Sequence, residues 1–194
     1  MATPNITMFF PAYNEAKNIR KLLSSALKVL SQVANEYEIL VIVYEGSTDG
    51  TVGIARKLAG KNKKIRVLIQ PINKKGIGYA NIMGFENAKY PYIFYADSDN
   101  QFDLKDFRKF LPYIEKYDVI AGYRINRQDP ITRILVSKVY NVVMRFLFGL
   151  KERDLDCSFR LVNKRVINSI SLICSTGVAT SELLAKAAKH GFKI

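Results

Sequence analysis

The chain has 194 residues, of which 48% are hydrophobic and 24% charged, so its composition is that of one globular domain rather than a disordered or low-complexity protein. Thirty Lys and Arg against 17 Asp and Glu give a formal net charge of +13, which favours a polyanionic partner: phosphorylated substrates, an anionic membrane surface or nucleic acid. Two cysteines are too few for a disulfide framework, and the single histidine argues against histidine-based metal sites.

Short apolar runs alternate with segments of helical periodicity along most of the chain. We expect strands at residues 6–12, 38–43, 65–70, 92–96 and 118–123, and helices at 15–32, 51–59, 78–88 and 104–116. This repeated order predicts an α/β fold, with a mainly parallel sheet that carries helices on both faces. After it we expect a long helix at 131–150, a short strand at 158–162 and a helix at 181–189.

Two carboxylates follow the strand expected at residues 92–96. Asp97 and Asp99 are two positions apart, so in an extended chain their side chains point the same way. Together they can hold one hard cation, as Mg²⁺ or Mn²⁺ is held on a diphosphate. A simple turn is the alternative, because Asp, Ser and Asn are common in loops. The position at the end of a buried strand, where open α/β sheets bind ligands, favours the metal.

Three other loops at strand ends carry polar residues. Residues 10–15 (Phe-Pro-Ala-Tyr-Asn-Glu) either begin a helix or contact a nucleobase or ribose. Residues 44–51 place acidic groups beside Gly and Ser, which suits hydrogen bonds to ribose hydroxyls as well as a plain turn. Residues 73–78 are basic and glycine-rich, so their N–H groups and lysines can neutralise phosphate, although the ending of a P-loop is absent.

The helix expected at residues 131–150 is apolar except at a few positions. Four of the polar residues recur every four positions and form one narrow polar stripe: Arg133, Ser137, Asn141 and Arg145. Cations on or beside this stripe favour a helix that lies in a membrane surface. The alternative is a core helix whose Lys and Arg side chains extend to solvent. The sequence leaves both interpretations open.

Together and in this order, the motifs resemble those of family 2 glycosyltransferases with the GT-A fold. The matching segments are residues 11–15 (Pro-Ala-Tyr-Asn-Glu), 45–51 (Glu-Gly-Ser-Thr-Asp-Gly-Thr), 73–76 (Asn-Lys-Lys-Gly), 96–103 (Ala-Asp-Ser-Asp-Asn-Gln-Phe-Asp), 153–160 (Arg-Asp-Leu-Asp-Cys-Ser-Phe-Arg), 181–187 (Ser-Glu-Leu-Leu-Ala-Lys-Ala) and 191–194 (Gly-Phe-Lys-Ile). The resemblance covers essentially the whole chain and implies a single GT-A domain, residues 1–194, with a Rossmann-like sheet and a closing strand at its C-terminus. The branch that acts on dolichyl and other polyprenyl phosphates is the most similar.

The resemblance implies an inverting, metal-dependent hexosyltransferase that uses a UDP- or GDP-sugar. It places the cofactor, Mg²⁺ or Mn²⁺, on Asp97 and Asp99, where the cation stabilises charge on the departing nucleoside diphosphate. The residues expected to contact the donor nucleotide are Pro11, Ala12, Tyr13, Glu15, Glu45, Gly46, Ser47, Asp49, Lys75, Gly76, Asp97 and Ser98.

The acceptor side allows two mechanisms. A hydroxyl acceptor needs a general base, for which Asp154 and Asp156 are the candidates. A polyprenyl phosphate is already anionic and needs positive charge instead. Five cations are candidates for binding that phosphate: Arg124, Arg127, Arg133, Lys138 and Arg160. Arg124 is also a candidate catalytic residue. Arg160 could instead pair with Asp154 or Asp156. The net charge and the long apolar helix favour the lipid acceptor and an anionic membrane surface. We therefore expect a cytoplasmic protein that is peripheral at the inner face of the membrane.

Two departures from the family pattern matter. The family usually has Asp-Asp-Gly-Ser where this chain has Tyr-Glu-Gly-Ser at residues 44–47, which changes the expected contact with the nucleobase. The chain also ends at Ile194, inside the expected closing strand, so the resemblance implies a truncated domain. A transferase for a soluble or polysaccharide hydroxyl and a catalytically silent nucleotide-binding domain are the alternatives. Nucleic acid is not an expected partner, because the aromatic residues lie in apolar runs and not between basic residues.

Overall fold

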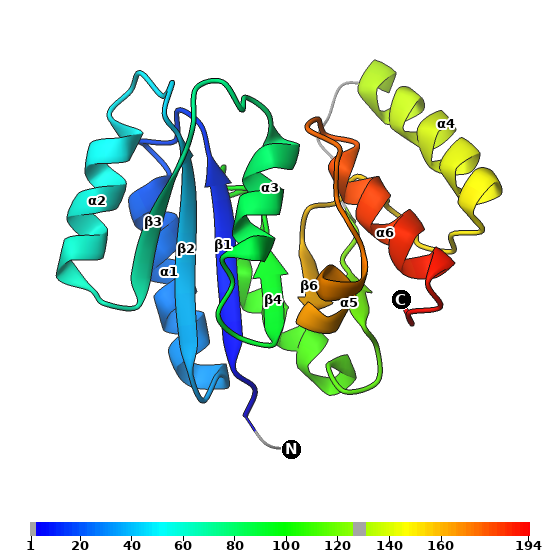
Figure 1. The fold of residues 1–194 in the computed structure, drawn as a ribbon, viewed down its shortest axis with the longest axis horizontal. Coiled ribbons are helices and arrows are strands. Elements are labelled where there is room, and N and C mark those ends of the chain that lie inside the picture. Colours follow the sequence, from blue (N-terminus) through cyan, green and yellow to red (C-terminus); the bar gives the residue numbers. More distant parts are fainter. Residues whose placement is uncertain (1–2, 126–130) are drawn as a thin grey trace.

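The computed structural model describes residues 3–125 and 131–194, without the side chains of residues 131 and 133–136, and places six strands and seven helices in this part of the chain (Figure 1). The strands are β1 (Ile6–Ala12), β2 (Tyr37–Tyr44), β3 (Ile65–Gln70), β4 (Tyr92–Tyr95), β5 (Val119–Ala121) and β6 (Arg160–Asn163). The helices are α1 (Ile19–Val33), α2 (Thr51–Lys61), α3 (Ile77–Glu86), the 3₁₀ helix η1 (Leu104–Tyr113), α4 (Ile131–Phe148), α5 (Lys164–Ser169) and α6 (Ala179–Lys189). The predicted α/β class is confirmed.

All six strands form one sheet, in the order β3-β2-β1-β4-β6-β5. Strand β1 pairs in parallel with β2 and β4, and β2 pairs in parallel with β3, whereas β6 is antiparallel to both of its neighbours. The chain thus moves outward from β1 to β3 and then returns to the other side of β1 for β4. In open α/β sheets, such a reversal of strand order leaves a crevice at the carboxyl ends of the strands.

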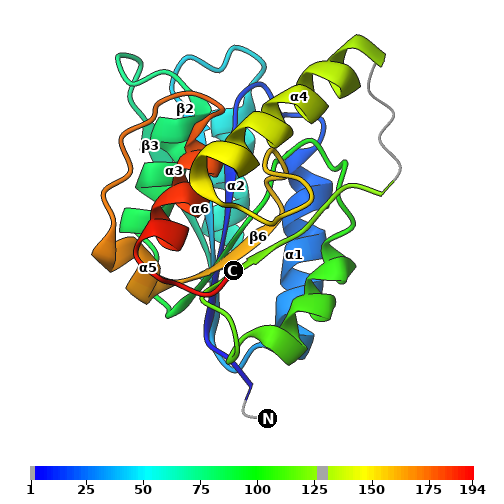
Figure 2. The same cartoon turned by 90° about the vertical axis from the view of Figure 1, so that its right-hand side faces the viewer.

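Each face of the sheet has its own hydrophobic core. On β1, Met8 and Phe10 belong to the core formed with α1, α2 and η1, whereas Phe9 belongs to the core formed with α3, α5 and α6. On β2, Val41 and Ile42 divide between the two cores in the same way. Figure 2 shows α1 on one side of the sheet and α3 and α5 on the other. Burial on both faces explains why the central strands read as unbroken apolar runs.

Some elements differ from the prediction for local reasons. Helix α1 begins at Ile19 and not at residue 15, because residues 16–18 form a turn in which the Asn18 N–H donates to the Glu15 carbonyl at 2.9 Å. Segment 104–113 is a 3₁₀ helix that contains Pro112, whose missing N–H disfavours a longer α-helix. The strand expected at 191–194 is not formed in the described residues, although the Lys193 carbonyl accepts hydrogen bonds from the start of β5. Helix α5, only six residues long, was not predicted.

Helix α4 packs against α6 at the β5 end of the molecule, away from β3 (Figures 1 and 2). It contains 18 residues, which corresponds to a length of about 27 Å at ~1.5 Å per residue. No helix in the described parts of the chain is both long enough and apolar enough to cross a membrane.

Candidate active site

A cavity of about 310 Å³ opens at the carboxyl ends of β1 to β4. Its lining residues come from these strand ends and from the loops and helix that follow them: Pro11, Ala12, Tyr13, Glu15, Tyr44, Gln70, Lys75, Gly76, Ile77, Ala80, Asp97, Ser98 and Asp99. The cavity therefore lies at the reversal of strand order. The carboxylate pair and the basic glycine-rich loop, predicted from separate parts of the sequence, meet in this one cavity.

Asp97 and Asp99 line the same cavity, and their charges interact. Burial raises the pKa of Asp97, a hydrogen bond from the Ser158 side chain opposes this, and the charge of Asp99 raises the pKa further. A bound cation would offset the cost of burying the Asp97 charge and the repulsion between the two carboxylates. Carboxylate oxygens are also the ligands that Mg²⁺ and Mn²⁺ prefer. Among the described residues, no cluster of three His, Cys, Asp or Glu is placed to hold a metal alone. A cation on this pair would take further ligands from a diphosphate and water.

Four residues predicted to contact the donor do not line this cavity: Glu45, Gly46, Ser47 and Asp49. Their contacts instead connect neighbouring loops. The Asp49 carboxylate accepts a hydrogen bond from the Thr51 hydroxyl and another, 2.9 Å long, from the N–H of Ala16. The bond from the Thr51 hydroxyl is the main cause of the lowered pKa of Asp49. Glu45 accepts a hydrogen bond from the N–H of Ile72 at 3.1 Å. These residues fix the loops that carry the cavity wall.

Tyr44 is a cavity residue that the sequence analysis did not predict, although it is the position at which the chain departs from the family pattern. Its hydroxyl donates to the carbonyl of Ile72 at 3.0 Å. Its ring meets the ring of Tyr13 edge to face, with centroids 5.4 Å apart. A Cβ added to Gly46 would lie 2.5 Å from the Tyr44 ring, so this residue has to be small. An aromatic wall thus stands where the family usually has a carboxylate.

The basic glycine-rich loop is held from behind by the segment that precedes α6. Gly76 has φ of 128°, which favours glycine, and a Cβ there would lie 2.2 Å from the carbonyl oxygen of Ser175. A Cβ on Gly78 would lie 2.0 Å from the carbonyl oxygen of Cys174. On its other side the segment is fixed by Glu182, whose carboxylate accepts a hydrogen bond from the Cys174 N–H at 2.9 Å. Close backbone packing therefore positions the loop at the cavity.

We expect Gly78→Ala to lower the free energy of unfolding by about 1–3 kcal/mol, because its Cβ would meet a backbone carbonyl that cannot move alone. Gly53→Ala is the matched control: it also lies in a helix, but its Cβ would meet nothing within 4 Å. That variant should gain about 0.5–1 kcal/mol. Chemical denaturation of both variants measures the difference, and equal stabilities would show that the close packing at Gly78 is absent.

A second cavity, of about 340 Å³, lies between α4, the segment after β5 and the segment before β6. It is lined by Tyr123, Arg124, Ser137, Lys138, Asn141, Val142, Arg145, Arg153 and Asp154. Four of these residues are cationic and one is a carboxylate, so the cavity suits an anion. Arg124 and Lys138 were predicted on the acceptor side, whereas Arg145 and Arg153 were not. Arg145 could have been predicted from the sequence, because it follows Lys138 by seven residues and therefore lies on the same side of one helix.

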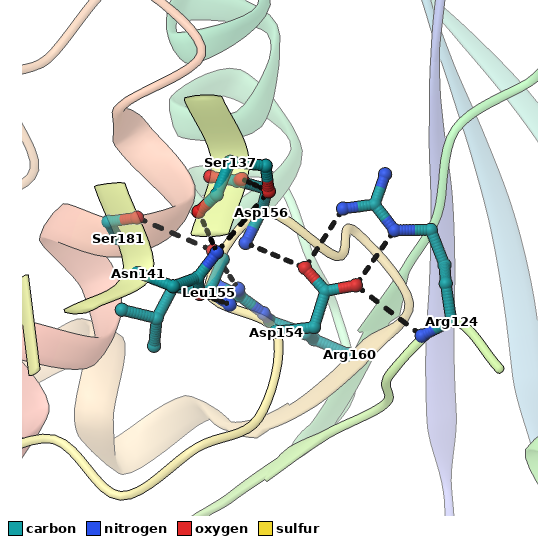
Figure 3. A network of polar contacts seen from close by, with 8 residues as sticks. All are labelled: Arg124, Ser137, Asn141, Asp154, Leu155, Asp156, Arg160 and Ser181. Carbon is teal, nitrogen blue, oxygen red and sulfur yellow. Dashed lines mark hydrogen bonds and ion pairs between the residues drawn. The ribbon is translucent and has the colours of Figure 1, made fainter. Parts of the chain in front are cut away.

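Two other predicted acceptor-side cations lie outside the described residues: Arg127 is not described at all, and the side chain of Arg133 is not described. Arg124 lies against Asp154 (Figure 3), and its Nε and Nη2 donate to the two carboxylate oxygens at 2.8 Å each. This pairing with Asp154 raises the pKa of Arg124. A carboxylate held in this way orients the guanidinium and is poorly placed to remove a proton.

The two central residues of the polar stripe predicted on α4, Ser137 and Asn141, face inward. Ser137 and Asn141 are only 7% and 4% exposed. Ser137 donates to the carboxylate of Asp156 at 2.8 Å, and the side chain of Asn141 accepts from the N–H of Leu155 at 2.7 Å (Figure 3). Ser137 and Asn141 therefore bind the segment before β6, a direction that neither interpretation of this helix predicted, whereas Arg145 is partly exposed and lines the second cavity.

Arg160 is not an acceptor-site residue, and that prediction was wrong. Its side chain is 0% exposed and lies between β6 and α6 (Figure 3). Nη2 donates to the carbonyl of Leu155 at 2.5 Å, and Nη1 donates to the carbonyl of Thr180. The Tyr95 hydroxyl is 3.5 Å from Nη1. Arg160 thus joins two segments of the core through backbone carbonyls and does not pair with Asp154 or Asp156.

The sheet order and the cavity at its reversal define the GT-A fold of glycosyltransferases. Among solved structures, glucosyl-3-phosphoglycerate synthase from Mycobacterium tuberculosis in complex with UDP aligns with a TM-score of 0.73. The two chains are 18% identical, and the alignment covers 96% of this chain and 66% of that chain. At this identity the likeness establishes the fold.

The chain belongs to glycosyl transferase family 2, because the model of that family matches residues 7–171. It is 26% identical over 167 residues to undecaprenyl-phosphate 4-deoxy-4-formamido-L-arabinose transferase of Pectobacterium carotovorum, covering 86% of this chain and 51% of that protein. It is 28% identical over 186 residues to the transferase of the same name from Aeromonas hydrophila, covering 94% and 56%. The chain spans about half the length of the curated relatives it matches.

Proposed function

We propose that this chain is the catalytic domain of an inverting, metal-dependent transferase that moves a sugar from a UDP- or GDP-sugar to a polyprenyl phosphate. One observation carries the proposal: Asp97, Asp99 and the loop of Lys75 line one cavity at the reversal of strand order. The names of the curated relatives support the acceptor, since they are undecaprenyl-phosphate transferases. The glucosyl-3-phosphoglycerate synthase, crystallised with Mn²⁺ and UDP-glucose, supports the donor and the metal.

On the donor side, Asp97 and Asp99 would hold Mg²⁺ or Mn²⁺, which neutralises charge on the diphosphate when bound. Lys75 and the backbone at Gly76, which line the same cavity, would bind the phosphates. The nucleoside lies toward the end of the cavity where Tyr13 and Tyr44 meet.

On the acceptor side, the four cations of the second cavity hold the acceptor phosphate: Arg124, Lys138, Arg145 and Arg153. An oxygen of this phosphate attacks the anomeric carbon as the bond to the diphosphate breaks, and the nucleoside diphosphate leaves. The attacking oxygen is already ionised, so no general base is required. The pairing of Asp154 with Arg124 agrees with this, because it uses the carboxylate to orient a cation. The protein then works peripherally at the inner face of a membrane, where such acceptors reside.

Calorimetry with UDP and GDP, with and without Mn²⁺, tests the donor half. We expect metal-dependent binding of one nucleotide; binding of neither would contradict the proposal and favour a catalytically silent domain. Transfer of labelled sugar to a polyprenyl phosphate tests the acceptor half. Arg124→Gln should keep nucleotide binding but lose about 10²-fold in transfer, in the range for removing one charge-stabilising group. Arg56→Gln, an exposed site on α2, should leave both unchanged. Transfer to a soluble hydroxyl instead would assign the alternative acceptor.

A further inference from the structure

Helix α4 has the reverse of the usual amphipathic arrangement. The polar residues Ser137 and Asn141 are buried, while Phe146 and Leu147 are 88% and 63% exposed. Five exposed large apolar residues lie on the side of the helix opposite Ser137 and Asn141 and are called the outer face below: Val139, Val142, Val143, Phe146 and Leu147. A helix of a globular protein normally turns its apolar side to the core. Here the core-facing side combines hydrogen bonds of Ser137 and Asn141 with Met144, which packs against the core.

The outer face is contiguous. Residues 139, 142, 143 and 146 are spaced three and four positions apart, so they are neighbours on one side of the helix. A continuous apolar patch of this kind on a soluble domain marks an interaction surface rather than scattered exposure. The outer face therefore requires an apolar partner.

The charge around the outer face indicates what that partner is. Helix α4 contains Arg133, Lys138 and Arg145 and no acidic residue, and the whole chain carries +13. Apolar side chains combined with cations are typical of helices that insert into an anionic lipid surface. A second copy of the chain would bring like charges together across the contact, which is unfavourable. We propose that the outer face of α4 docks into the surface of an anionic bilayer, with the helix lying in the interfacial plane.

Docking by this face also positions the second cavity. Lys138, Val142 and Arg145 line that cavity and belong to the same helix. With the outer face in the lipid, Lys138 and Arg145 beside it are expected to lie near the depth of the headgroups, within reach of a lipid phosphate. This consequence for the acceptor rests on the proposed function, whereas the docking itself does not.

Co-sedimentation with vesicles tests the docking. The wild-type chain should bind vesicles of phosphatidylglycerol and phosphatidylcholine, bind pure phosphatidylcholine more weakly, and lose affinity as salt rises. The double variant Phe146→Gln/Leu147→Gln should lose about tenfold or more in vesicle affinity, because it removes apolar area but keeps good helix propensity. The matched control is Ile72→Gln, an exposed apolar residue in the loop after β3, which should bind like the wild type.

Undiminished vesicle binding by the double variant, or no binding by the wild type, would overturn the docking. So would a wild-type dimer, measured by light scattering, that the double variant abolishes without any binding to vesicles. Transfer assays separate this from the proposed function. The double variant should fail on a polyprenyl phosphate embedded in vesicles but act normally on a short, water-soluble isoprenyl phosphate. A wild-type chain that binds vesicles but transfers to neither acceptor would refute the function and leave the docking standing.

Discussion

Replacing Asp97 or Asp99 by Asn is expected to lower sugar transfer by about 10²–10³-fold, the range observed when one charge-stabilising group is removed from an active site. Both carboxylates line the cavity at the reversal of strand order, and each substitution takes one charged ligand from the pair. Metal-dependent binding of the nucleotide should weaken in both variants. Rates of transfer and titrations with UDP, GDP and Mn²⁺ measure the two effects.

The Asp97→Asn variant should keep its fold, for an electrostatic reason. Burial raises the pKa of Asp97, and the charge of Asp99 raises it further against the opposing hydrogen bond from Ser158. A carboxyl group whose pKa is higher in the folded state destabilises that state once the pH rises through the folded pKa. Asn carries no charge, so this variant should be at least as stable as the wild type at neutral pH. The difference should shrink as the pH falls toward the ordinary Asp value of about 4.

The raised pKa of Asp97 also predicts how metal binding depends on pH. Protons compete with the cation for Asp97, so Mn²⁺ affinity should fall as the pH falls through the raised pKa of this group. Asp106→Asn is the matched control, since this exposed carboxylate on η1 pairs only with the surface residue Lys109 among its described contacts. It should retain full activity. Undiminished turnover in both Asp97→Asn and Asp99→Asn would remove the metal assignment.

Arg160→Met is expected to destabilise the chain by about 3 kcal/mol or more. The guanidinium is fully buried and donates to the carbonyls of Leu155 and Thr180. Methionine fills part of the space but offers no donor, so each carbonyl loses a hydrogen bond from a charged group, worth about 1.5–3 kcal/mol, and the Leu155 carbonyl keeps only the bond from the Ser181 hydroxyl at 3.4 Å. Because these carbonyls belong to the backbone, no side-chain repacking can remove them from the core.

Thermal and chemical denaturation measure the effect, with Arg56→Met as the control for the same chemical change at an exposed site on α2. The control should lie within about 0.5 kcal/mol of the wild type. An Arg160→Met variant with unchanged stability but lost transfer would show that Arg160 belongs to the acceptor site after all.

The parts of the fold that follow from local pattern could be predicted from the sequence. The central strands are buried on both faces and therefore read as apolar runs, and β3 has the predicted bounds. The carboxylate pair was found because it follows such a strand. The inward direction of the α4 stripe could not be found, since the spacing of Ser137 and Asn141 is the same whichever side the helix presents. Arg160 was predicted in the acceptor site because the order of segments along the chain does not reveal that β6 lies between β4 and β5, antiparallel to both.

The segment before β6 joins the two cavities. Ser158 contacts Asp97, accepting its N–H at 3.3 Å, while Asp154, four residues earlier, holds Arg124 of the second cavity. One short peptide therefore contacts both the proposed site of the leaving diphosphate and the proposed site of the attacking phosphate. Under the proposed mechanism, a change in the length of this peptide should impair in-line attack more than it impairs the binding of either ligand alone. If the proposed function holds, residues 154–158 would act as a spacer between the donor and acceptor sites.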